Sequence, residues 1–153
     1  MLKTTVLILL CSFALGTIEF RSYFGGVSIP DAGAEVPVTV EYTTTTTTRK
    51  IKNMEVWIWA THDRVSDLEV RLESTLLFDN QASASGPGAN LGSGSYPIRF
   101  KNGETSLSSF VAPGEGEYYA PVEDLITSAD DVNPEKAWLV KFKDTSAGTT
   151  GNI

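Results

Sequence analysis

Residues 51–74 read IKNMEVWIWATHDRVSDLEVRLES, and their apolar side chains recur at every second position. The alternation runs through residues 54–60, stops at the mostly polar segment 63–66, and resumes at Leu68. A period of two is typical of a half-buried β-strand, and a short polar interruption between two such runs predicts a turn. We therefore expect a β-hairpin whose buried face ends in His62 and resumes at Leu68.

The same alternation recurs on both sides of this stretch, at residues 36–40 and 138–142, where Trp138 is expected in the core. Beyond the N-terminal segment we find no apolar stripe of period 3.6 that would indicate an amphipathic helix. Short strands separated by turn residues predict an all-β fold, here a jelly-roll-like β-sandwich of two antiparallel sheets. The six threonines at 43–48 predict an exposed edge or hairpin end, and residues 82–95 predict a long surface loop.

The first sixteen residues have the pattern of a secretory signal peptide. Lys3 supplies a basic start, an apolar run follows at 6–15, and Ala14 and Gly16 have the spacing that a signal peptidase prefers. The run is too short for a helix that crosses a bilayer core of about 30 Å, so a retained anchor is the weaker interpretation. We expect a signal peptide at 1–16, a lead-in at 17–26 and one domain at 27–153, either extracellular or, in a Gram-negative cell, periplasmic.

Composition limits the chemistry further. The chain has a net charge of −7, and removal of the predicted peptide, whose one charged residue is Lys3, leaves −8. An acidic surface repels phosphate groups, which argues against nucleic acid and, after cleavage, against anionic membranes as partners. The one cysteine, Cys11, lies inside the peptide, so the mature chain would contain neither a disulfide nor a thiolate metal site.

Four separate segments carry a resemblance to a known family. In residues 51–74 the matching positions are Ile51, Met54, Val56, Ile58, Ala60, His62, Asp67, Leu68, Val70, Leu72 and Ser74. The others are Ile29-Pro30-Asp31, Tyr119-x-Pro121 with Leu125, and Trp138-x-Val140-x-Phe142-x-Asp144 with Gly148 and Gly151. In order and spacing they resemble the P domain, or Homo B domain, of kexin- and furin-like subtilisin proprotein convertases and of bacterial secreted proteins.

The resemblance implies a non-catalytic accessory module that stabilises a subtilisin-like serine endopeptidase. It makes His62, Asp67, Leu68, Trp138 and Asp144 a structural motif, and it implies that the sandwich lacks the family's last strand. His62 is the one histidine, and nothing in the sequence resembles a Ser-His-Asp triad or a nucleophile elbow. We expect no enzyme activity, and we expect His62 to hydrogen-bond across the predicted turn, near Asp67.

Trp57 and Trp59 suggest an alternative function. By alternation they point away from the predicted buried face and would form a flat aromatic strip, flanked across the hairpin by Glu69 and Arg71. Such a strip suits an extracellular module that binds carbohydrate or a cell surface, with a polysaccharide as partner. The competing interpretation is that a loop covers the two indoles or that the buried face is reversed.

Calcium is the candidate ion, because the family's relatives often bind it and because oxygen ligands from loops suit it. The chain has no EF-hand pattern, and acidic residues in loops are commonly only solvated. The candidate ligands are Asp31, Asp63, Asp67, Asp79, Asn80, Asp130, Asp131 and Asp144.

Overall fold

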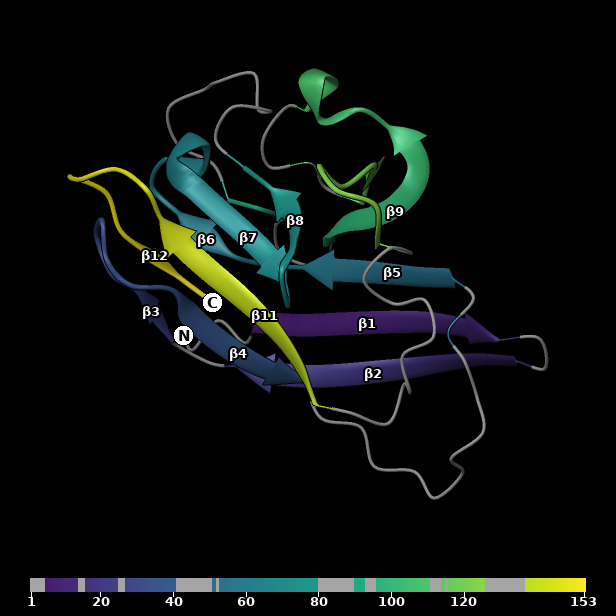
Figure 1. The fold of residues 1–153 in the computed structure, drawn as a ribbon. Helices are drawn as coiled ribbons and strands as arrows, with labels where there is room; N and C mark the ends of the chain where they lie inside the picture. Colours follow the sequence, from purple (N-terminus) through teal and green to yellow (C-terminus); the bar gives the residue numbers. More distant parts are fainter. Residues whose placement is uncertain are drawn as a thin grey trace.

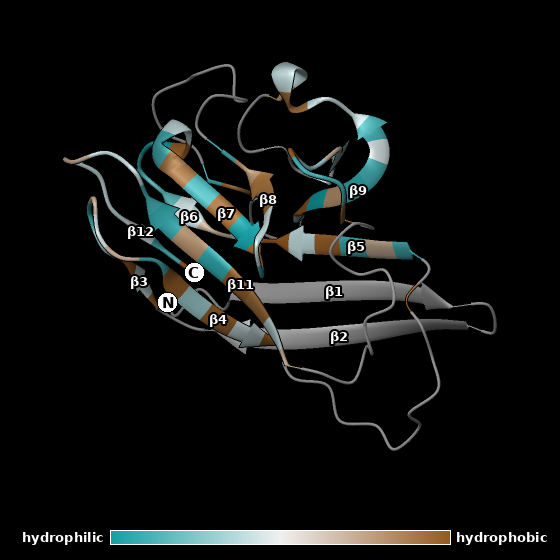
Figure 2. Cartoon of the chain, in the orientation of Figure 1, coloured by the Kyte–Doolittle hydropathy of each residue, from teal (hydrophilic) through white to brown (hydrophobic). Residues whose placement is uncertain are grey.

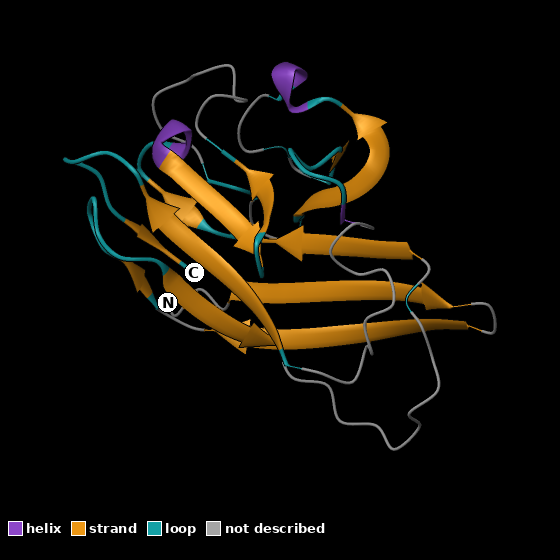
Figure 3. Ribbon diagram, in the orientation of Figure 1, coloured by secondary structure: helices purple, strands orange, loops and turns teal. Residues whose placement is uncertain are grey.

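The computed structural model describes residues 5–13, 16–24, 27–40, 51, 53–79, 90–92, 96–110, 114, 116–125 and 137–153, the first two ranges as backbone only. Strands dominate these residues, together with the short 3-10 helices η1 (Val65–Asp67) and η2 (Leu107–Ser109) (Figure 3). The predicted all-β sandwich is thereby confirmed. None of the helices among the described residues has the length and hydropathy needed to cross a membrane.

The strands form three sheets (Figure 1). The five-stranded sheet has the order β10 (Tyr118–Tyr119), β9 (Ile98–Thr105), β5 (Asn53–Ile58), β1 (Thr5–Phe13), β2 (Gly16–Phe24). The four-stranded sheet has the order β4 (Val36–Val40), β11 (Trp138–Asp144), β7 (Leu68–Leu72), β8 (Thr75–Phe78). The three-stranded sheet has the order β3 (Ser28–Ile29), β12 (Gly151–Asn152), β6 (Thr61–His62). This small third sheet and the parallel pairing of β10 with β9 add to the predicted pair of antiparallel sheets.

One continuous core is built from the inward faces of the strands. Buried and partly exposed residues alternate along β5, β7 and β11, as their sequences predict, and Figure 2 shows the matching alternation of hydropathy. Trp138 is fully buried, as expected, and belongs to the same apolar cluster as Val56 of β5 and Val70 of β7. A second aromatic group joins Phe78, Phe110 and Tyr119 edge to face, with ring centroids 5.4 Å apart in each pair. The two larger sheets therefore share their apolar interior.

The predicted hairpin is wrong. β5 pairs with β9 and β1, whereas β7 pairs with β11 and β8, so the two strands belong to different sheets. The chain crosses between the sheets through β6 and η1, and residues 59–67 are too long a connection for a tight hairpin. Alternation specifies which face of a strand is buried. It does not specify the neighbouring strand, and two strands that face each other across a core satisfy it equally well.

β1 pairs antiparallel with β5, with Ile8 opposite Trp57, and it also pairs with β2. β1 belongs to the predicted signal peptide, and β2 covers most of the predicted lead-in. Cleavage after Gly16 stays a prediction. Loss of β1 would leave the backbone groups of one edge of β5 without their strand partner.

The threonine run 43–48 and most of the predicted loop 82–95 lie outside the described residues.

Candidate functional site

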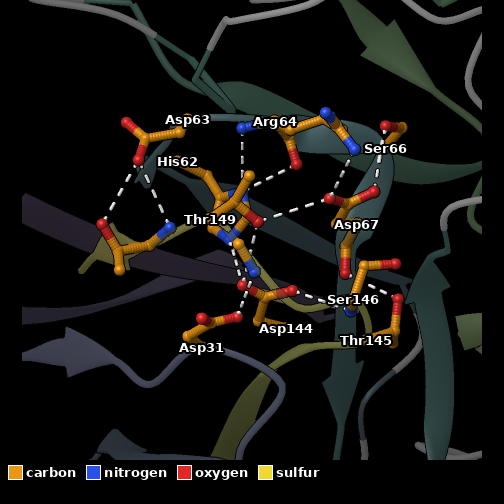
Figure 4. Close-up of polar contacts among 12 residues, drawn as sticks. Asp31, His62, Asp63, Arg64, Ser66, Asp67, Asp144, Thr145, Ser146 and Thr149 are labelled. Atoms are coloured by element: carbon orange, nitrogen blue, oxygen red, sulfur yellow. Dashed lines mark hydrogen bonds and ion pairs between the residues drawn. The ribbon is translucent and has the colours of Figure 1, made fainter.

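His62 is the centre of a buried polar network at the end of the sandwich (Figure 4). Its Nε2 atom lies 3.2 Å from Asp144 Oδ2, and neither side chain is exposed. Its Nδ1 atom lies 2.7 Å from the carbonyl oxygen of Arg64. The expected contact between His62 and Asp67 is therefore wrong, and the partner is 82 residues away in the sequence. His62 meets Asp144 because of the order of the strands: β7 pairs with β11, and this pairing places Asp144 opposite Leu68.

Thr149 connects this pair to Asp67. Its hydroxyl oxygen lies 3.2 Å from Asp144 Oδ2 and 3.3 Å from Asp67 Oδ2. The backbone carbonyl of Asp67 also accepts hydrogen bonds from the amide and the hydroxyl of Thr145, at 2.7 and 2.8 Å. The buried polar groups of the motif therefore join the connection between β5 and β7 to the loop that follows β11.

The geometry of His62 suits a structural role better than a catalytic one. A general base must reach the proton of a bound substrate, directly or through one water molecule. The ring of His62 is buried, and both of its nitrogens lie within hydrogen-bond distance of protein oxygens. Hydrogen bonds of this kind satisfy a buried polar side chain and stabilise the fold around it.

Gly151 permits the close approach of β12 to His62. A Cβ atom at this position would lie 2.5 Å from His62 Cδ2 and 2.6 Å from the carbonyl oxygen of Thr61. Both distances are far below van der Waals contact, so a larger residue would push β12 away from β6. The glycine is thus part of the packing around the buried pair.

Four of the calcium candidates, Asp31, Asp63, Asp67 and Asp144, lie near the loop 145–150, where protein donors contact their carboxylates. Asp31 Oδ1 accepts a hydrogen bond from the amide of Gly148 at 2.8 Å, and Asp63 Oδ2 accepts two from Thr150 at 3.3 Å. Asp67 faces Thr149, and Asp79 lies just beyond β8. Within the described part of the chain, no three His, Cys, Asp or Glu side chains are grouped closely enough to hold a metal ion. Asn80, Asp130 and Asp131 lie outside the described residues.

Trp57 and Trp59 are both partly exposed, as alternation predicts. The predicted neighbours of the strip are wrong, because Glu69 and Arg71 lie on β7, in the other large sheet. Arg71 Nε contacts Glu69 Oε1 at 2.6 Å, and this hydrogen bond raises the pKa of Arg71 above its ordinary value. The two side chains therefore form an ion pair with each other, away from Trp57.

The neighbours of Trp57 come from β9 and β10. Arg99 stands opposite both Trp57 and Tyr118 in the strand register. Its guanidinium carbon lies 4.4 Å from the ring centroid of Trp57 and 5.0 Å from that of Tyr118. We call these three residues the Trp57–Arg99–Tyr118 stack. The alternation of residues 98–101, IRFK, is the signal that could have placed Arg99 and Lys101 on one outer face.

Lys101 lies beside the stack, with its ammonium nitrogen 5.4 Å from the ring centroid of Tyr118. Carboxylates of Glu104 and Glu55 lie 3.3 and 3.7 Å from it. The pKa of Lys101 is raised, chiefly by its hydrogen bond with Glu104 and next by the charge of Glu55. Trp57 Nε1 donates a hydrogen bond to Glu55 Oε2 at 3.2 Å. Two carboxylates of this face, those of Glu55 and Glu104, therefore pair with Lys101.

Arg99 differs from Lys101 in its partners. Its Nε atom is buried and has no hydrogen-bond partner among the described residues. The same part of the chain contains no carboxylate within ion-pair distance of Arg99, in contrast to the two at Lys101. Arg99 thus has stacking partners in the described structure and no charge partner.

Comparison of the chain with protein-family models, with curated proteins and with solved structures finds no match. The resemblance to P domains therefore stays a prediction from the motif residues of the sequence.

Proposed function

We propose that this chain is a secreted, non-catalytic accessory module that resembles the P domain and docks on a separate subtilisin-like peptidase. The observation that supports this proposal is the convergence of the motif segments. Asp31, His62, Asp67 and Asp144, which come from three of the four segments, all contact the same end of the sandwich or the loop 145–150. Buried side chains in such contacts hold a scaffold together, as expected of a non-catalytic module.

A reconstitution experiment tests this function. The purified chain is added to the catalytic domain of a kexin-like peptidase that was produced without its own P domain, and the half-life of peptidase activity on heating is measured. The expected result is a longer half-life at equimolar chain than with an equal mass of serum albumin. An unchanged half-life, or hydrolysis of casein by the purified chain alone, would contradict the proposal.

The second candidate function is binding of an extracellular carbohydrate by the outer face of the five-stranded sheet. The observation that favours it is the partly exposed Trp57, whose indole N–H is hydrogen-bonded to Glu55 at 3.2 Å, which orients the ring. A rigid aromatic side chain offers a large contact area at a low entropic cost. Retention of the chain on insoluble polysaccharide, lost in Trp57→Ala and kept in Arg71→Gln, would support this function.

A further inference from the structure

We propose that the Trp57–Arg99–Tyr118 stack binds an acidic polysaccharide, with a uronate carboxylate on Arg99 and sugar rings against the aromatic side chains. The inference rests on the second candidate function and names its ligand class. It concerns the outer face of β5, β9 and β10, whereas the buried pair of His62 and Asp144 belongs to β6 and β11.

The first argument is geometric. Strand register places Trp57, Arg99 and Tyr118 side by side on three neighbouring strands, and all three are partly exposed. The two aromatic side chains flank the arginine and provide apolar area for the carbon–hydrogen face of a sugar ring. Tyr96, which is 58% exposed, is the nearest side chain to a Cβ built on Gly116, two residues before Tyr118. Aromatic surface therefore extends past the stack.

The second argument is charge. A guanidinium group that stacks on rings keeps its N–H donors in its own plane, where a carboxylate is bound by two parallel hydrogen bonds. Arg99 has no such partner among the described residues, and its side chain is partly exposed, so a ligand can approach it from solvent. Glu55 and Glu104 contact Lys101 instead. A carboxylate is therefore the group that completes the contacts of Arg99.

The third argument separates the ligand classes. A neutral glycan would stack on the rings and leave Arg99 without a counter-ion. Single-stranded nucleic acid also binds aromatic and basic side chains, but it requires a positive groove along its backbone. This chain has a net charge of −7, and two of the groups beside the stack are glutamates. A polymer with one carboxylate per sugar and apolar ring faces fits this face, where Arg99 has no carboxylate partner among the residues that the structure describes.

Calorimetric titration of the full chain tests the inference. The probes are oligogalacturonate, the same oligomer with its carboxyl groups fully methyl-esterified, a neutral β-glucan oligomer and oligo(dT). We expect oligogalacturonate to bind at least about tenfold more tightly than its ester, because the ester removes the charge-assisted hydrogen bonds to Arg99. Arg99→Gln should weaken oligogalacturonate binding by at least about tenfold and leave ester binding unchanged.

Arg71→Gln is the matched control, since it removes an arginine from the outer face of the other large sheet, and it should bind like the parent. Circular dichroism checks that each variant is folded. If Arg99→Gln does not fold, Arg99→Lys keeps the charge without the planar donors, and we expect weaker oligogalacturonate binding there too.

The outcomes distinguish failure of the uronate inference from failure of carbohydrate binding as a whole. Equal affinity for the acid and the ester would overturn the uronate inference and leave carbohydrate binding standing. Absence of binding to all three oligosaccharides would overturn both. Tighter binding of oligo(dT) that depends on Arg99 would overturn the inference in favour of nucleic acid.

Discussion

Asp144→Ala should destabilise the fold through one contact, the hydrogen bond between Asp144 Oδ2 and His62 Nε2. Asp144 also lies 3.2 Å from the hydroxyl of Thr149 and accepts a hydrogen bond from the amide of Ser146 at 3.0 Å. Thr149 keeps its contact with Asp67, and Ser146 is partly exposed, so water can replace the lost acceptor. His62 has no such replacement, because its side chain is fully buried.

The expected loss of stability comes from His62, which Asp144→Ala leaves buried without a partner for its Nε2 atom. A buried group that loses its hydrogen-bond partner costs about 1–3 kcal/mol. Because both side chains are fully buried, we take the upper end of this range, about 3 kcal/mol, as the expected loss in the free energy of unfolding. With a urea slope of about 2 kcal/mol per molar, the unfolding midpoint should fall by about 1.5 M.

Urea titration followed by tryptophan fluorescence measures this shift, since Trp138 is fully buried in the fold. Asp31→Ala is the matched control, because Asp31 is exposed and accepts one hydrogen bond, from the amide of Gly148. We expect a loss below about 1 kcal/mol there. If Asp144→Ala does not fold, Asp144→Asn, which keeps the shape, should show a smaller loss in the same direction. Equal midpoints for Asp144→Ala and Asp31→Ala would refute the reasoning.

Three further predictions concern packing, surface charge and calcium. Gly151→Ala should cost about 1–3 kcal/mol through overpacking against His62, and a melting temperature at or above that of the parent would contradict the packing argument. Glu69→Gln should change the free energy of unfolding in urea by less than about 1 kcal/mol, because its pair with Arg71 is partly exposed, and a larger loss would show a stronger role for the pair. Addition of EGTA should leave the melting temperature unchanged, because Asp31, Asp63 and Asp67 already accept hydrogen bonds from the protein, and a decrease would show that the chain binds calcium.

Part of the candidate site could be predicted from the sequence. The alternation in residues 51–74 correctly predicted that His62 is buried and that Trp57 faces outward, because side-chain direction along a strand depends on local geometry alone. The contact between His62 and Asp144 and the neighbours of Trp57 could not be predicted in this way. Each depends on which distant strand lies alongside, and a period of two is the same for every partner.

By itself, the sequence determined the fold class and the two faces of each recognised strand. Polar and apolar side chains must separate between water and the core, and a strand does this with every second residue. The tertiary structure alone decided that β5 and β7 lie in different sheets, that Asp144 rather than Asp67 meets His62, and that Arg99 rather than Arg71 stacks on Trp57. These choices follow from the joint packing of all the strands around one core, a property of no single segment.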